Sequence, residues 1–305
     1  MLGYMVEASD DSHDVVEPVD APEGGTVNIA GEVRELTTEG WPTGYQYGAT
    51  RYADVILRQS FPDRFSDLVK ALKEFSPTLD ELRAGGGGRT VFVARFDKSL
   101  EDMVSPEGEQ VWGKQNITIE KSVSLDGKNL RTARTRGHEI DMFGKGSSDD
   151  PIPGIAVEME WNNKDPFYDR DLINFQALHY EGAIAVGVIV TRGPRLQALI
   201  GPNIRSKDNG YKFGPSTTHW DKLIPKVNLG GGGECPLILI GIEPERIADR
   251  ELLERSEELR QLAEGFRSNW RNDDSFERWA DARPVYDQLK KDWEDALPPV
   301  KDSKS

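Results

Sequence analysis

The sequence predicts an α/β fold in which helices flank a central mixed β-sheet. The run at 183–191, Ala-Ile-Ala-Val-Gly-Val-Ile-Val-Thr, is almost wholly apolar, as strands buried on both faces are. Apolar residues recur at helical spacing before this run, at 51–75, and after it, at 219–227. Helix and strand patterns that alternate along 305 residues are typical of one large α/β domain.

The N-terminal third is predicted to contain a tail, two helices and two strands. Residues 1–30 are rich in Asp, Glu, Pro and Gly with little periodicity, so we expect a flexible tail. The Phe61-Pro62 step interrupts the helical pattern at 51–75, which indicates two helices. A four-glycine run then breaks the chain, and the β-forming residues at 91–96 and 117–123 predict strands.

The middle of the chain is predicted to supply the centre of the sheet. Acidic and apolar side chains alternate at 155–161, which is a strand pattern. A helix is expected at 169–179, where Asp169 or Asp171 is favourable near the N-terminus. The apolar strand at 183–191 is expected to be central or parallel, because both of its faces require burial.

The C-terminal part is predicted to combine a loop, a helix, a strand and an extension. Residues 192–216 mix Arg, Gly, Pro and Asn and indicate a long loop. Thr217 or Thr218 can cap the helix at 219–227, and a strand follows at 237–242. The expected parts of the chain are a flexible acidic tail at 1–30, the main domain at 31–245, and a charged helical extension at 246–305 that packs on the domain or dimerises.

Composition limits the possible functions. The net charge of -15 argues against a nucleic-acid binder, but residues 121–230 carry 15 basic and 13 acidic residues, so the acidic excess lies outside the centre. The central basic residues can line a groove or form an ordinary solvated surface. No apolar run reaches ~18 residues and no signal-like N-terminus is present, so we expect a cytoplasmic protein without a membrane segment. The single cysteine, Cys235, is interpreted as a core residue.

Three carboxylates, Asp141, Glu158 and Glu160, form the most informative motif. In a strand, Glu158 and Glu160 point to one face, whereas Val157 and Met159 point to the other. Like charges this close repel and raise each other's pKa unless a cation lies between them. Because Mg²⁺ prefers oxygen ligands of this kind, the motif predicts a metal site.

Other candidate sites are less well supported. Asp149 and Asp150 compete with Asp141 as the first ligand, but they lie in a turn-like segment rich in Ser, Pro and Gly. The four-glycine runs lack the phosphate-loop pattern and are interpreted as turns. A hydrolase triad has no support because no nucleophile elbow accompanies the histidines that could serve it, His138, His179 and His219.

The order of these motifs resembles that of type II restriction endonucleases of the BglII and BstYI kind, themselves similar to BamHI. The resemblance begins with Ile140-Asp141, a short connection, and Val157-Glu-Met-Glu-Trp-Asn-Asn163. It covers roughly residues 138–243. The further segments in the same order are Pro166-Phe167, Leu178-His179, Val190-Thr-Arg-Gly193, Ser216-Thr-Thr-His-Trp and Cys235-Pro-Leu-Ile-Leu-Ile-Gly241.

This resemblance implies a PD-(D/E)xK nuclease core with Mg²⁺ as cofactor. Asp141 and Glu158 match the two metal-holding positions, to which the main-chain carbonyl of Met159 is added. Glu160 occupies the third position, which is commonly Lys but is Glu in BamHI and Gln in BglII. It can orient or deprotonate the attacking water, or bind a second cation.

The resemblance also implies DNA contacts on both sides of the next strand. Asn163 can equally be a turn residue, Thr217 a helix cap, and Arg170 the partner of a neighbouring acid. The predicted contacts are Asn162, Asn163, Lys164, Arg170, Arg192, Ser216, Thr217, Thr218 and His219.

The implied activity is that of a homodimeric, Mg²⁺-dependent deoxyribonuclease that cuts a short palindromic site in double-stranded DNA. A GATC-centred site and a cognate DNA methyltransferase are further implications. Two alternatives stay open: a catalytically silent DNA-binding or protein-interaction module of the same fold, and a repair nuclease without sequence specificity.

Overall fold

The computed structural model describes residues 31–84, 89–134, 138–147, 149–164, 166–206 and 210–297. The predicted tail at 1–30 and the glycine run at 85–88 therefore lie outside the described residues. Within the described part of the chain, no helix is both long and apolar enough to cross a membrane.

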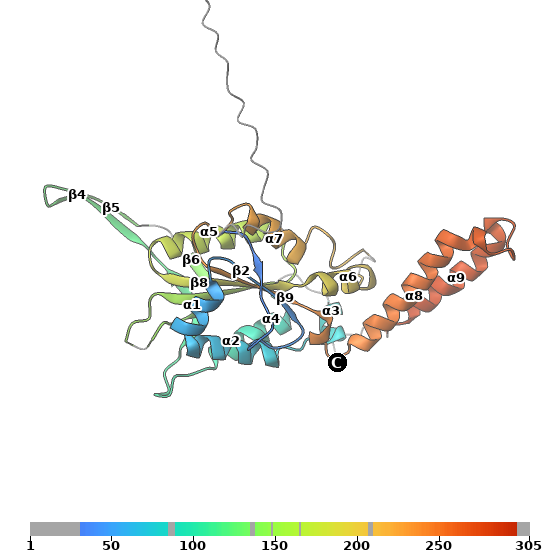
Figure 1. Cartoon of the computed structure of the whole chain (residues 1–305), viewed down its shortest axis with the longest axis horizontal. Coiled ribbons are helices and arrows are strands. Elements are labelled where there is room, and N and C mark those ends of the chain that lie inside the picture. The colour runs from blue at the N-terminus through green and yellow to red at the C-terminus, as the bar shows by residue number, and fades with distance from the viewer. Residues whose placement is uncertain are drawn as a thin grey trace, which may run out of the picture.

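The body of the protein is a seven-stranded mixed sheet between two layers of helices (Figure 1). The strand order is β1-β2-β9-β8-β7-β6-β3, with β7, β8 and β9 parallel and the outer pairs antiparallel. The predicted α/β class is confirmed, and so is the central parallel position of the apolar strand, β8. The strands are β1 Arg34–Glu35, β2 Tyr45–Ala49, β3 Trp112–Ile117, β6 His138–Gly144, β7 Gly154–Glu160, β8 Ile184–Arg192 and β9 Leu237–Ile242.

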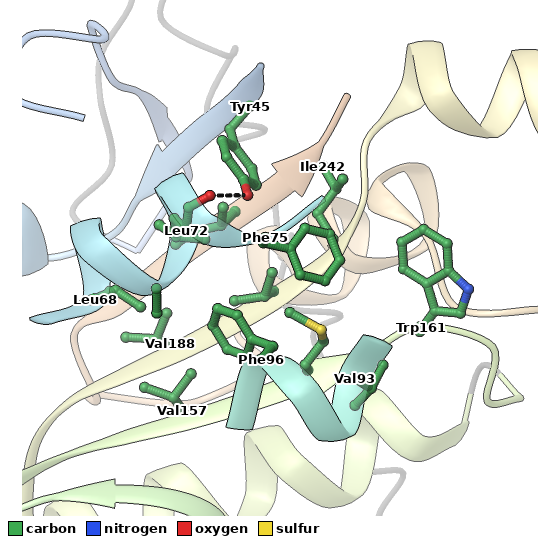
Figure 2. Close-up of a cluster of buried hydrophobic side chains, with 14 of the residues drawn as sticks. Tyr45, Leu68, Leu72, Phe75, Val93, Phe96, Val157, Trp161, Val188 and Ile242 are labelled. Atoms are coloured by element: carbon green, nitrogen blue, oxygen red, sulfur yellow. Dashed lines mark hydrogen bonds between the residues drawn. The ribbon is translucent and has the colours of Figure 1, made fainter. Parts of the chain in front are cut away.

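One face of the sheet packs against the N-terminal helices. The two helices expected at 51–75 are α1 (Ala53–Ser60) and α2 (Pro62–Glu74), with Pro62 in the first helical turn, where a missing N–H costs nothing. Figure 2 shows Leu68 and Leu72 of α2 in the same buried cluster as Val157 of β7. This core determines that β7 turns its apolar side chains toward α2, and therefore its acidic side chains away from it.

The opposite face of the sheet packs against α5 (Pro166–Tyr180) and α7 (Trp220–Asn228). Leu172 and Phe175 of α5 are buried there, which confirms the helix expected at 169–179. Since Ala156 of β7 belongs to the same cluster, the alternating acidic residues of β7 lie on the side of the sheet that α5 covers.

Three local predictions are wrong. Residues 91–96 form part of helix α4 (Val91–Glu101), which buries Phe92, Phe96 and Leu100 at helical spacing. The first part of the loop expected at 192–216 is instead helix α6 (Pro194–Asn203), which starts at a proline. Neither Thr217 nor Thr218 caps α7, because its N-cap residue is His219, which makes no side-chain capping bond.

Two appendages leave the body. Strands β4 (Glu120–Leu125) and β5 (Lys128–Arg134) form an exposed hairpin that projects from one end (Figure 1). At the other end, α8 (Arg250–Asn269) and α9 (Trp279–Asp295) lie side by side. Asn203 of α6 ties both helices to the body, since its amide oxygen accepts bonds from Ser256 (3.1 Å) and Trp293 (3.0 Å). The remaining short helix, α3, spans Leu79–Arg83.

Candidate active site

The candidate active site lies where β6 and β7 run side by side beneath α5. The strands pair antiparallel with Met142 opposite Val157, which places Asp141 beside Glu158. The backbone N–H of Asp141 donates a hydrogen bond to Glu158 Oε1 at 3.2 Å, across 17 residues of sequence. The structure therefore brings together the two carboxylates that the sequence predicts as metal ligands.

Burial and neighbouring carboxylates both act on Glu158. Its side chain is buried, and burial raises its pKa to about 10, with the negative charges of Asp141 and Asp171 adding to the increase. A cation near these oxygens would reverse the effect, because opposite charge favours the ionised carboxylate. The donor set consists of hard oxygen atoms with excess negative charge, so it fits a hard divalent cation.

A complete metal cage is not assembled by side chains alone. Within the described ranges, no group of three acidic, histidine or cysteine side chains is gathered closely enough to hold an ion. Mg²⁺ does not require one, since it commonly takes one or two carboxylates and completes its shell with water and substrate phosphates. Asp141 and Glu158 fit that requirement, and the carbonyl of Met159 stays the predicted third ligand.

The alternative first ligands lie outside the strand. Asp149 and Asp150 are exposed, in a turn where the N–H of Ser147 donates to the carbonyl of Asp150 at 2.9 Å. Asp141 is part of β6 and lies directly beside Glu158. The geometry therefore favours Asp141 over the turn residues.

Glu160, the last residue of β7, has partners of its own. Asn163 Nδ2 donates to Glu160 Oε2 at 2.5 Å, and Arg170 Nη2 lies 3.4 Å from Glu160 Oε1. Arg170 Nε also donates to Asp171 Oδ1 at 2.8 Å, and its Nη2 forms an ion pair with the same oxygen at 2.7 Å. Arg170 thus pairs with the neighbouring acid on its helix, which was one of its two predicted roles.

Asp171 is a member of this site that sequence reasoning missed. It is buried, and burial raises its pKa to about 8, helped by the charge of Glu160. The sequence showed it only as an acidic residue in the first half of a helix. Its approach to Glu160 depends on how α5 lies over β7, which no local pattern predicts.

The comparison with protein families agrees with this geometry. The family described as Restriction endonuclease BglII/BglIII matches residues 45–242. The chain belongs to this family. A search of curated proteins found no match. As a family member, the chain is a type II restriction nuclease, an endonuclease that binds and hydrolyses DNA. The match runs from β2 to β9 and includes every predicted site residue, whereas α8 and α9 lie beyond it.

The endonuclease brings its two predicted DNA-contacting segments together. Lys164 forms an antiparallel bridge with Thr217, and the N–H of Thr218 donates to the carbonyl of Asn163 at 2.9 Å. Because Asn163 also bonds to Glu160, the edge that these two segments form is linked directly to the carboxylates. Within these two segments, the residues with exposed side chains are Asn162, Asn163, Lys164 and Ser216.

Arg192 has a different position from the one expected. Its side chain is 0% exposed, and it donates to Thr217 Oγ1 (2.5 Å) and to the carbonyl of Thr218 (2.6 Å). The guanidinium also lies 5.9 Å from the ring centroid of Trp161. In this structure Arg192 therefore holds the 217–218 segment, and its phosphate contact stays a prediction. Thr218 and His219 are also buried, so their side chains do not face a DNA surface in this conformation.

Proposed function

We propose that the endonuclease is Mg²⁺-dependent and cuts a short palindromic site in duplex DNA as a homodimer. The observation that supports this best is the pairing of Asp141 with the buried Glu158, whose pKa is raised by burial and by nearby carboxylates, in a nuclease whose reaction needs positive charge. A two-fold protein matches a two-fold sequence, which supports dimeric cutting of a palindrome. By family resemblance, the proposed site is GATC-centred and a cognate methyltransferase protects it.

The residues of the site have different roles in the proposed reaction. Asp141, Glu158 and the Met159 carbonyl would hold the ion, which when bound polarises the scissile phosphate and lowers the pKa of a water. Glu160 is held by the Asn163 amide with its second oxygen toward Arg170. That position suits a group that orients the attacking water or accepts its proton.

The edge formed by the two loop segments is proposed to contact DNA. Amides of Asn162 and Asn163 can pair with adenine edges, and the hydroxyls of Ser216 and Thr217 can pair with several bases. Lys164 is proposed to contact a phosphate, which fixes position rather than sequence. Because one segment follows β7 and the other is bonded to Arg192 of β8, correct docking would align the scissile phosphate with the carboxylates.

The test is plasmid cleavage in Mg²⁺ by the wild type and by the Asp141→Ala and Glu158→Ala variants. We expect both variants to lose about a thousandfold or more in rate, the usual scale for removing a main source of transition-state charge stabilisation. Undiminished cutting by either variant would remove the assignment. Sequencing of the cut ends completes the test: one recurring palindrome is expected, whereas random ends indicate a nuclease without sequence specificity.

A further inference from the structure

Arg170 occupies the place of a cation between two buried carboxylates. Its single nitrogen Nη2 lies 2.7 Å from Asp171 Oδ1 and 3.4 Å from Glu160 Oε1. The Asp171 and Glu160 side chains are only 1% and 4% exposed, whereas that of Arg170 is 54% exposed. The two carboxylates are therefore fixed in the protein, and the positive charge between them comes from a side chain that reaches solvent.

The two carboxylates retain capacity for a further ligand. The Asn163 amide donates to Oε2 of Glu160, and the other carboxylate oxygen, Oε1, faces Nη2 of Arg170. Asp171 Oδ2 is buried and has no hydrogen-bond partner among the described residues. A buried, unpartnered carboxylate oxygen is costly, and such atoms in native structures commonly mark an ion or water that completes the site.

We infer that Glu160 and Asp171 form a second divalent-cation position beside the Asp141–Glu158 pair, and that Arg170 fills this position in the DNA-free protein. The inference rests on the proposed Mg²⁺-dependent function and adds a residue, Asp171, and a built-in competitor, Arg170, to its site. Two carboxylates with waters and a substrate phosphate form a sufficient ligand set for Mg²⁺ or Mn²⁺.

The arrangement couples the second cation position to DNA. Arg170 is the exposed member of the cluster, and guanidinium groups bind phosphate oxygens in a bidentate manner. A phosphate that draws Arg170 outward leaves no positive charge between Glu160 and Asp171. Glu160 and Asp171 would then be free to hold a second cation once the substrate is in place.

The experiment is a titration with Mn²⁺ alone, in which electron paramagnetic resonance measures free Mn²⁺ in the absence of DNA. Arg170→Gln is expected to bind one more Mn²⁺ per chain than the wild type, or to bind it about tenfold more tightly, because one positive charge beside the site is removed. Adding Asp171→Asn to that variant should abolish the gain. Equal stoichiometry and affinity in the wild type and Arg170→Gln would overturn the inference.

Two controls use the same chain. Arg170→Lys keeps the charge and is expected to bind Mn²⁺ as the wild type does. Arg195→Gln removes an arginine that also bridges two carboxylates, Glu243 and Glu245, elsewhere in the fold, and should gain no ion. If Arg170→Gln does not fold, Mn²⁺ is titrated into the wild type bound to a duplex that carries its cleaved site. Extra Mn²⁺ binding over the DNA-free protein supports the inference, and its absence overturns it.

The failure of this inference differs from the failure of the proposed function. Plasmid cleavage by the wild type in Mg²⁺, without any gain of Mn²⁺ by Arg170→Gln, would overturn only the second cation position. A gain of Mn²⁺ by Arg170→Gln, with no cleavage by the wild type, would support the position and overturn the nuclease assignment.

Discussion

Two exposed arginines in this molecule each bridge a pair of carboxylates, yet their surroundings differ. Both side chains are more than half exposed, and each contacts at least one deeply buried carboxylate. Similar local geometry therefore occurs at the carboxyl ends of two central strands that run in the same direction. The pairs are Arg170 with Glu160 and Asp171 after β7, and Arg195 with Glu243 and Glu245 after β9.

The difference is in how the buried charge is compensated. Glu243 accepts a hydrogen bond from the N–H of Leu196 (3.2 Å) in the first turn of α6, where the helix dipole favours an anion. Burial raises its pKa only to about 7, because Arg195 and that N–H oppose the increase. Beside Arg170, burial raises the pKa of Asp171 to about 8 and that of the neighbouring Glu158 to about 10, and nearby carboxylates add to both increases. Negative charge left without local compensation marks a functional site, whereas compensated charge supports the fold.

The largest expected effect tests this difference through activity. Glu158→Gln keeps the shape of the side chain but removes its charge, and is expected to lower the cleavage rate in Mg²⁺ by about a thousandfold or more. Glu243→Gln removes an equally buried charge and should change the rate by less than about threefold, because its role is structural. Initial rates on a plasmid provide the measurement. Comparable losses of cleavage rate in the two variants would contradict the distinction between a catalytic and a structural buried carboxylate.

A buried arginine offers the next comparison. Arg192 and Arg195 are three positions apart, but Arg192 is completely buried and bonded to the 217–218 segment. Arg192→Met is expected to destabilise the protein by about 2–4 kcal/mol, because it leaves buried acceptors without a donor. Arg195→Met should cost less than about 1 kcal/mol, as an exposed ion pair does. Urea unfolding measures both, and equal costs would contradict the positioning role of Arg192.

The pH dependence of stability gives a smaller effect. The folded-state pKa of Glu158, about 10, lies above its unfolded value. Its contribution to stability is therefore fully present below about pH 4.5 and is lost as the pH rises toward about 10. In metal-free solution at about pH 8, Glu158→Gln is expected to be more stable than the wild type by about 1–3 kcal/mol, and the difference should shrink at about pH 5.

Unfolding at the two pH values, with EDTA present, checks this sign. For Glu243 the corresponding window lies between about 4.5 and about 7, so Glu243→Gln should show a smaller dependence on pH. A stability difference between Glu158→Gln and the wild type that does not change with pH would show that folding does not raise the pKa of Glu158.

Much of the fold and part of the site could be predicted from local patterns. The apolar run of β8 and the alternation in β7 depend on burial along one strand, so they are visible in a short window. The β6–β7 carboxylate pair followed from that alternation and from the resemblance to restriction endonucleases.

The remaining features depend on longer windows or on tertiary packing. In α4, the residues at 91–96 have high strand propensity, and only the inclusion of Leu100 shows the helical spacing of Phe92, Phe96 and Leu100. Asp171 joins the site because α5 lies over β7. Arg192 is removed from the surface because the 217–218 segment folds over it. Neither contact leaves a periodic pattern in the sequence.

The smallest expected effect concerns Lys164, whose charge is proposed to contact DNA rather than another protein group. Lys164 is exposed and lies opposite Thr217 at the proposed DNA edge. If it contacts one phosphate, Lys164→Ala should weaken DNA binding several-fold for all sequences alike and lower the slope of log affinity against log salt by about 0.9. Lys290→Ala, in the α9 helix outside the family match, should change neither quantity. Fluorescence anisotropy over a salt series measures both slopes. An unchanged slope for Lys164→Ala would assign this lysine to the protein surface rather than to the DNA interface, and would leave Arg170 as the phosphate-contacting candidate nearest the carboxylates.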